Sequence, residues 1–269
     1  MNGISILMYH QVGDFRRVKA HRAVFCHQRR FAAQMALLKR LRCSVLTMDQ
    51  VLACIAGGLA VPPRAVAITF DDGYQSFYDT ALPQLQRYGF PATVYVVAAL
   101  VGRTAAWLPT DGLAAAPLMD AAHLRAIRRA GIQVGSHAMN HLPLAGLAPE
   151  RLATELAGSR AALEDLLGEP IRHLCYPYGS HDLAAVEAAA RAGYASGVTC
   201  QRALATRAFD PLALPRKAIS LGDDLLGFWW KVGFKHRPKG VAVSRPPSLE
   251  GGVIHRLSQE DQLSTDEHR

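Results

Sequence analysis

The chain has 269 residues, of which 50% are hydrophobic and 19% charged, with a net charge of +8, as in a globular protein with a sizeable core. It lacks an apolar run of about 18 residues, which a transmembrane helix needs, and its start shows no signal-peptide pattern. Its five cysteines have no paired spacing, so we expect reduced thiols in a cytoplasmic protein.

Short apolar runs alternate with helical patterns along the chain. Strands are predicted over residues 4–9, 44–47, 65–70, 92–98, 132–136, 172–176, 195–199 and 217–220. Helices are predicted over residues 29–42, 49–56, 81–88, 121–130, 149–167 and 182–192, and Gly89 and Gly168 stand where two of them should end. This alternation favours a parallel sheet, either open or closed into a barrel, with functional residues at the C-terminal ends of its strands.

The composition changes after about Lys235, where Pro, Gly and polar residues dominate. We therefore predict a catalytic domain over residues 1–235 and a disordered polar tail over residues 236–269. Just before this boundary, the segment from Leu225 to Phe234 concentrates aromatic residues. It is interpreted as a final packing element, or alternatively as a segment that lies in a membrane interface.

Nine Lys and Arg residues and no acid occur from Arg16 to Arg42. This segment is either a solvated basic face or a patch that meets an acidic partner, such as anionic lipid headgroups or a phosphorylated sugar carrier. No nucleic-acid binding motif accompanies the charge, so we expect no nucleic acid as a partner.

Two adjacent carboxylates, Asp71 and Asp72, close the predicted strand at residues 65–70. Burying both is unfavourable unless each has a partner. Because neighbouring side chains diverge, one carboxylate can bind a metal while the other faces a substrate. Alone, this Asp-Asp-Gly sequence would indicate only an Asp-capped turn.

His137 and His141 follow the predicted strand at residues 132–136. They can converge on one ion if the residues between them form a single helical turn. Together with a carboxylate they would make a three-ligand site that leaves one position open for water. A lone pair of this spacing is weak evidence, and the strand-terminal Asp pair strengthens it.

The sequence Tyr176-Pro177-Tyr178-Gly179 follows the predicted strand at residues 172–176. Proline stiffens the turn, and glycine allows the backbone to approach a ligand closely. Such a turn can direct the N–H of Tyr178 at a developing oxyanion, or it is an ordinary strand–helix loop.

In this order and at these separations, TFDDG, SHxxxH and YPYG resemble the polysaccharide deacetylases of carbohydrate esterase family 4, the NodB-homology domain. The resemblance covers roughly residues 3–222. The opening ILMYHQVG is similar to the circularly permuted branch that includes poly-N-acetylglucosamine deacetylases. In that branch a histidine motif moves to the first strand, where His10 matches it. The resemblance implies an α/β fold, a distorted (β/α)7-type barrel with the active site at the C-terminal ends of the strands.

The resemblance also implies a role for each motif residue. Asp71 would be the general base, and His10 the general acid that protonates the leaving amine. Three residues would hold a divalent metal ion, most readily Zn²⁺: Asp72, His137 and His141. Three would form the oxyanion and substrate site: Pro177, Tyr178 through its backbone N–H, and Gly179.

The sequence departs from the family pattern around the base. Most members carry an Arg that orients the base where this chain has Cys175. Arg216, ahead of the predicted strand at residues 217–220, can supply the guanidinium, or it is a structural surface arginine. His10 has no evident orienting partner, and Asp223 and Asp224 are weakly placed candidates.

The expected reaction is hydrolytic removal of the N-acetyl group from a GlcNAc-type oligosaccharide, polysaccharide or lipid-linked glycan, releasing acetate. Trp107 is a candidate wall of the sugar cleft. Without an export signal, we hypothesise a cytoplasmic enzyme, peripheral at the inner membrane face, that docks through the segment from Arg16 to Arg42. The alternatives are a glycan-binding pseudoenzyme, a metal-dependent amide or imide hydrolase on a non-sugar substrate, and a membrane-surface scaffold.

Overall fold

The computed structural model describes residues 3–15, 18, 22–105, 107, 115–240, 243 and 245. Three residues of the predicted basic segment lie outside the described residues: Arg16, Arg17 and Lys19. The same holds for residues 241, 242, 244 and 246–269 of the predicted tail. Arg245 pairs with Asp210, but the predicted domain boundary after residue 235 stays a prediction.

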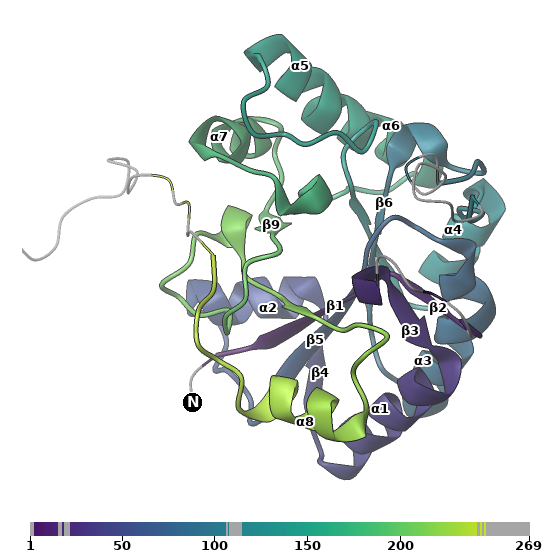
Figure 1. Ribbon diagram of the computed structural model, residues 1–269. Helices are drawn as coiled ribbons and strands as arrows, with labels where there is room; N and C mark the ends of the chain where they lie inside the picture. The colour runs from purple at the N-terminus through teal and green to yellow at the C-terminus, as the bar shows by residue number, and fades with distance from the viewer. Residues whose placement is uncertain are drawn as a thin grey trace, which may run out of the picture.

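Eight parallel strands form the central sheet (Figure 1). They are β1 (Ser5–Tyr9), β4 (Ser44–Leu46), β5 (Ala65–Phe70), β6 (Thr93–Val96), β7 (Gln133–Ser136), β8 (His173–Cys175), β9 (Ser196–Val198) and β10 (Lys217–Ala218). Seven follow the order β10-β1-β5-β6-β7-β8-β9, and β4 pairs with β5 outside this path. Each of the eight predicted strands is present.

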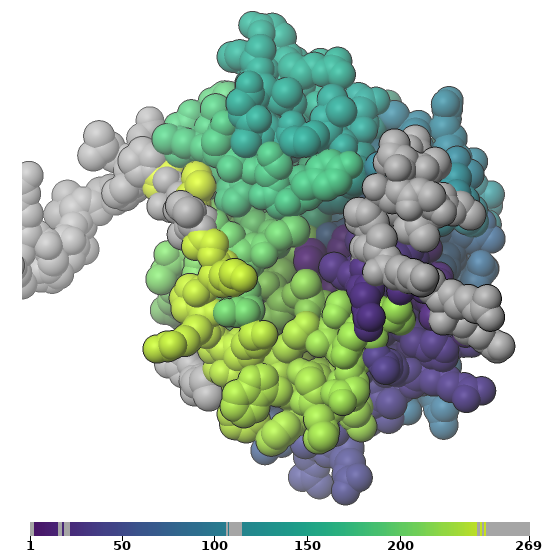
Figure 2. All heavy atoms as spheres, in the orientation of Figure 1, coloured from purple at the N-terminus to yellow at the C-terminus, as the bar shows by residue number. Residues whose placement is uncertain are grey.

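The two ends of this strand path meet through the residues just before β10. Leu214 donates its N–H to Gly197 O at 2.8 Å and accepts from Thr199 N at 2.9 Å, and Arg216 N donates to Gln201 O at 2.7 Å. The sheet therefore curls into a distorted barrel, which confirms the predicted fold class. As a result β1, from the first part of the chain, pairs with β10, and purple and yellow-green segments adjoin on the face shown in Figure 2.

Helices cover the outside of the sheet (Figure 1). They are α1 (Gln28–Arg40), α2 (Met48–Ala56), α3 (Leu82–Tyr88), α4 (Ala121–Arg129), α5 (Pro149–Ala153), α6 (Ser159–Leu167), α7 (Leu183–Arg191) and α8 (Leu225–Gly233). Gly89 and Gly168 end α3 and α6 with positive φ, as predicted. No helix among the described residues is long and apolar enough to cross a bilayer.

Three features differ from the sequence-based expectation. The predicted helix over residues 149–167 is α5 and α6 joined by a π turn, Thr154–Gly158, and a second π turn, Phe77–Ala81, precedes α3. A short parallel pair, β2 (Gln11–Gly13) with β3 (Phe25–His27), was not predicted, because three residues are too few to show alternation. Short 3₁₀ turns occupy Arg22–Val24, Ala98–Leu100, Pro177–Gly179 and Pro211–Ala213.

Side chains of β5 alternate between two cores. Val66, Ile68 and Phe70 of β5 belong to the larger core, which they share with the outer helices. Ala65 and Ala67 belong to a second core with residues of β1, β6, β8 and α2. Because side chains alternate along a strand, the series continues through Thr69 to Asp71 and directs Asp71 inward.

The inner core leaves no space for a side chain at Gly135 of β7. A Cβ atom there would lie 2.6 Å from Cδ1 of Tyr95 and 2.7 Å from the His173 carbonyl oxygen. We expect Gly135→Ala to lower the free energy of unfolding by about 1–3 kcal/mol, since a ring and a backbone would have to move. Urea unfolding followed by circular dichroism measures this change.

Gly233, the last residue of α8, is the matched control. Its added Cβ would meet nothing within 4 Å, so Gly233→Ala should change stability by less than about 1 kcal/mol, in the stabilising direction. Equal unfolding midpoints for the two variants would contradict this description of the inner core.

Candidate active site

Asp71 lies inside the barrel, directly after β5. Its N–H donates to Tyr9 O at 2.9 Å and extends the ladder between β1 and β5. Its side chain is 3% exposed. A carboxylate in this position needs a buried cation or several donors to remain charged.

Arg216 supplies that cation. Its Nη1 and Nη2 donate to Oδ1 and Oδ2 of Asp71 at 2.6 and 2.7 Å. It reaches Asp71 from the start of β10, where Nη1 also donates to Thr69 Oγ1 and Nε to Thr199 O. Burial raises the pKa of Asp71, but the Arg216 guanidinium outweighs burial, so the pKa is lowered and the carboxylate stays ionised.

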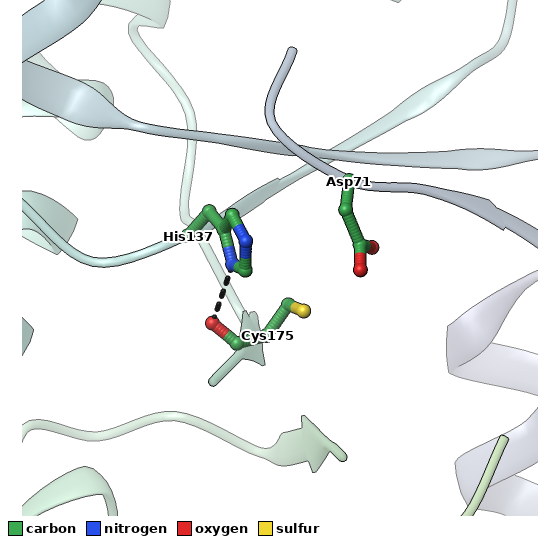
Figure 3. A group of neighbouring side chains, drawn as sticks. All are labelled: Asp71, His137 and Cys175. Atoms are coloured by element: carbon green, nitrogen blue, oxygen red, sulfur yellow. Dashed lines mark hydrogen bonds between the residues drawn. The ribbon is translucent and has the colours of Figure 1, made fainter. Parts of the chain in front are cut away.

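Cys175 lies beside this ion pair. Its Sγ is 3.1 Å from Nη2 of Arg216, and its carbonyl oxygen accepts a hydrogen bond from Nδ1 of His137 at 2.8 Å (Figure 3). Burial raises the pKa of the Cys175 thiol to about 11. Although Asp71, His137 and Cys175 lie close together, the thiol stays protonated and Arg216 occupies Asp71, so this group is a poor metal site.

A second group of donor atoms fits a metal ion better. Oδ1 of Asp72 lies 3.2 Å from Nε2 of His137 and 3.3 Å from Nε2 of His141. All three side chains are buried, and Oδ1 of Asp72 has no hydrogen-bond partner among the described residues. Two imidazoles and one carboxylate are the donor set of three-ligand sites for divalent metals. The structure thus brings together the three predicted ligands.

The electrostatics of this group suit a cation. Burial raises the pKa of Asp72, but His137 and His141 outweigh burial and hold that pKa well below its usual value. Burial lowers the pKa of His141. Burial lowers the pKa of His137 as well. Cys175 and Asp72 together raise this pKa by more than burial lowers it, so the net shift of the pKa is upward. A metal ion therefore competes with a proton at His137.

Left-handed backbone concentrates in the three sequence motifs. Among the described residues, six non-glycine residues have positive φ, and four of them are Asp72, Ala138, His141 and Tyr178. The helical turn that we considered as a way for His137 and His141 to converge is not formed. Instead, left-handed residues reverse the chain and bring the two imidazoles together. Such strained residues cluster at functional sites.

Glu155, which we did not single out in the sequence, anchors this loop. It is fully buried in the π turn between α5 and α6. Its Oε2 accepts from the N–H groups of Met139 and Asn140 at 3.1 and 2.9 Å, and its Oε1 accepts from Nδ2 of Asn140 at 2.7 Å. In the sequence, Glu155 could have been noticed only as an acidic residue next to Leu156, on the apolar face of the helix predicted over residues 149–167.

His10 follows β1 and faces Asp71. Its Nε2 lies 3.8 Å from Oδ2 of Asp71, and its Nδ1 is buried without a partner among the described residues. The suggested orienting partners prove wrong. Asp223 accepts from Ser220 and Lys231, while Asp224 caps α8 by accepting from Gly227 N.

Two aromatic rings flank His141. The ring centroid of Trp107 is 3.9 Å from that of His141, and the ring of Tyr178 is 4.6 Å from it. Tyr178 is 58% exposed. Trp107 therefore lies at the site, although residues 106 and 108–114 of its loop lie outside the described residues.

The Pro177–Gly179 turn stands beside these rings. Gly179 N donates to Tyr176 O, and Ser180 N donates to Pro177 O. A Cβ on Gly179 would lie 2.7 Å from that of Cys200, and its φ is +67°. Glycine is therefore required here by both space and conformation.

Sequence comparison places this site in a known family. Residues 59–197 match the family model described as polysaccharide deacetylase. A putative polysaccharide deacetylase of Bacillus subtilis, YxkH, is 26% identical over 219 residues, which is 81% of this chain and 72% of that protein. The poly-beta-1,6-N-acetyl-D-glucosamine N-deacetylase of Escherichia coli is 33% identical over 91 residues, but these are only 13% of its length.

Solved structures agree. The Streptococcus pyogenes deacetylase PplD, solved in complex with acetate, is 25% identical with a TM-score of 0.72, covering 86% of this chain and 98% of its own. IcaB from Ammonifex degensii, at 23% identity, has the same fold with a TM-score of 0.72 over 87% of this chain and 98% of its own. The predicted enzyme class, a carbohydrate N-deacetylase, is confirmed, and the chain belongs to the polysaccharide deacetylase family.

Proposed function

We propose that the chain catalyses metal-dependent hydrolysis of the acetamide of a GlcNAc-type sugar, releasing acetate and a free amine. The observation that carries this proposal is the pairing of two features at one end of the barrel. The Asp71 carboxylate is paired with Arg216. The neighbouring Asp72 carboxylate converges with the imidazoles of His137 and His141. The poly-N-acetylglucosamine deacetylase name of a partial relative supports the substrate class.

Asp72, His137 and His141 would hold the ion, and their donor set favours Zn²⁺. The hydrogen bond from Nδ1 of His137 to the Cys175 carbonyl leaves Nε2 as the ligand atom. When bound, a divalent ion supplies Lewis acidity that activates water and polarises the acetyl carbonyl.

Asp71 and His10 would carry the protons. Asp71 accepts the proton of the attacking water, and the ion pair with Arg216 keeps it ionised and correctly oriented. His10 lies beside Asp71 and donates a proton to the amine nitrogen as the C–N bond breaks. The backbone N–H of Tyr178 is the proposed donor to the oxyanion.

The flanking aromatic rings would bind the sugar. Tyr178 exposes its ring beside His141, and Trp107 lies against the same imidazole. Aromatic faces present apolar area with few rotatable bonds, and they suit the apolar face of a pyranose. Pro177 and Gly179 hold Tyr178 in this position.

Two alternatives share the same scaffold. A glycan-binding pseudoenzyme would need neither the buried base Asp71 nor the neighbouring His10. A metal-dependent amide or imide hydrolase acting on a non-sugar substrate would use the same residues, and only substrate tests separate it from a sugar deacetylase.

The first prediction from the proposed function concerns catalysis. Chitooligosaccharides should release acetate with the metal-loaded enzyme, and a chelator should abolish this release until Zn²⁺ is restored. Asp71→Asn should lower kcat at least about 100-fold, because a positioned base contributes about 10²–10⁴-fold. The control Asp79→Asn replaces an exposed carboxylate of the same segment and should leave kcat close to that of the wild type.

Release of acetate that persists with chelator would contradict the proposed metal dependence. A metal-loaded protein that releases no acetate from any sugar would instead favour the pseudoenzyme. Turnover of simple amides or imides alone would favour the non-sugar hydrolase.

The second prediction concerns Glu155. Removing its carboxylate in Glu155→Ala frees the loop between His137 and His141, so metal affinity should fall roughly tenfold or more. Titration against a chromogenic chelator measures this affinity, with circular dichroism to verify folding. Glu150→Ala, at an exposed position in α5, is the control, and equal affinities for the two variants would refute the positioning role.

We also propose an anionic membrane surface as a partner, because two features lie side by side (Figure 1). Helix α8 exposes an apolar face: Leu225, Leu226, Trp229, Trp230 and Phe234. The neighbouring α1 contains four basic residues and no acid. An aromatic face beside a basic one is typical of proteins that lie in a membrane interface.

The third prediction tests this partner. The double variant Leu226→Ser/Trp230→Ser should bind vesicles of phosphatidylglycerol and phosphatidylcholine at least about tenfold more weakly, since each buried apolar side chain contributes about 1.5–3 kcal/mol. Leu59→Ser, at another exposed leucine, should bind normally. Salt should weaken wild-type binding. Salt-insensitive binding, or none in cosedimentation, would exclude this partner.

A further inference from the structure

A basic cavity of about 210 Å³ lies between the residues after β9, β10 and the end of α8. Its lining contains five basic side chains and no acid: Arg202, Arg216, Lys217, Lys231 and Lys235, together with Cys200 and Ala218. A cavity lined by one sign of charge attracts ions of the other sign.

Two of the five cations are neutralised within the protein. Arg216 pairs with Asp71, and Lys231 pairs with Asp223 at 2.7 Å. Within the part of the chain that the structure describes, Arg202, Lys217 and Lys235 form no ion pair with a carboxylate. The cavity therefore holds three uncompensated positive charges.

Lys217 shows how unfavourable this arrangement is without an anion. The residue is 1% exposed, and its Nζ contacts Ser5 Oγ at 3.0 Å, the Lys231 carbonyl at 2.8 Å and Nδ1 of His236 at 2.9 Å. Burial and the charge of Arg202 lower the pKa of Lys217 to about 8. The N–H groups of its ammonium already have partners. Lys217 would therefore attract an anion through its charge rather than through a new hydrogen bond.

The cavity adjoins the active site. It shares Arg216 with the base and Cys200 with the turn at Gly179. A second hollow, of about 620 Å³, shares Cys200 and Arg202 with the basic cavity. Its lining also contains Gly179, His181 and Lys239. A substrate that reaches the site past Gly179 would thus place a neighbouring group near Arg202.

We propose that this basic cavity binds a phosphate group of the substrate, so that the enzyme acts on an N-acetylated sugar that carries a phosphate ester or diester. The inference rests on the proposed function and adds the charge of the substrate. Phosphate fits better than a carboxylate, since even a diester offers several acceptor oxygens to the guanidinium of Arg202 and the ammonium of Lys235, and a monoester adds a second negative charge.

Direct binding tests the cavity without turnover. Calorimetric titration of the metal-loaded full chain with inorganic phosphate and pyrophosphate should give saturable binding. The double variant Arg202→Gln/Lys235→Gln should bind about tenfold more weakly, which is about 1.4 kcal/mol. The control Arg129→Gln/Arg151→Gln removes two exposed basic residues from α4 and α5 and should bind as the wild type.

Absence of saturable binding, or equal binding by the cavity and control variants, would overturn the proposal. The second outcome would place the anion elsewhere, on the metal included. Lys217→Met is a further variant if the double variant folds poorly, because it removes the buried charge without touching Arg202.

Kinetics connect the cavity to the substrate. The ratio of kcat/KM for N-acetylglucosamine 1-phosphate over that for a neutral chitooligosaccharide should fall about tenfold in Arg202→Gln/Lys235→Gln, mainly through KM. An N-acetylated oligosaccharide that contains glucuronate is the comparison substrate that carries a carboxylate instead of a phosphate. A preference for it over the phosphate would overturn the phosphate assignment. Failure to deacetylate any sugar would refute the proposed function, while the binding titration would still decide the cavity.

Discussion

The buried ion pair between Asp71 and Arg216 is the constraint on which the rest of the site depends. A single guanidinium joins three other strands to the start of β10, because it contacts Thr69 of β5, Cys175 at the end of β8 and the carbonyl of Thr199 after β9. Burying two charges is unfavourable unless the geometry is good and the remaining donors are used. Here the bidentate contact and these extra bonds meet both conditions, so Asp71, the proposed base, is ionised and fixed in direction.

The same pair explains how this chain tolerates Cys175 at the position of the family arginine. The guanidinium comes instead from Arg216, the residue before β10. The thiol then fills the space that remains and stays neutral, while its carbonyl orients His137. One position thus contacts the partner of the proposed base through its sulfur and a proposed metal ligand through its backbone.

Much of this arrangement could be predicted from the sequence. Apolar, β-branched runs marked all eight strands, and β5 matched to the residue, because each run is flanked by turn residues. Because parallel strands bear function at their C-terminal ends, the sequence alone predicts that Asp71, Asp72 and His137 lie close together. Arg216 was identified only as the candidate for a missing charge, and its contact with Asp71 needed the three-dimensional closure of the barrel.

Other features had no readable signal. The π turn that carries Glu155 shifts the register by one residue, which a helical pattern averaged over 149–167 conceals. The strands β2 and β3 are too short to show a period. The basic cavity draws on residues 200–235 from three elements, and in sequence these charges are indistinguishable from solvated ones. Long-range assembly, rather than local preference, determines each of these.

The left-handed residues in the motifs have a consequence for the order of folding. Asp72, Ala138, His141 and Tyr178 each adopt a conformation that is unfavourable by about 1–3 kcal/mol in an isolated chain. The strand ends around them can hold these angles only after the barrel has closed. We therefore expect the geometry of the candidate metal site to form last, and partial loosening of the barrel to erase it first. Loss of metal should then report early damage to the fold, while the helices outside remain intact.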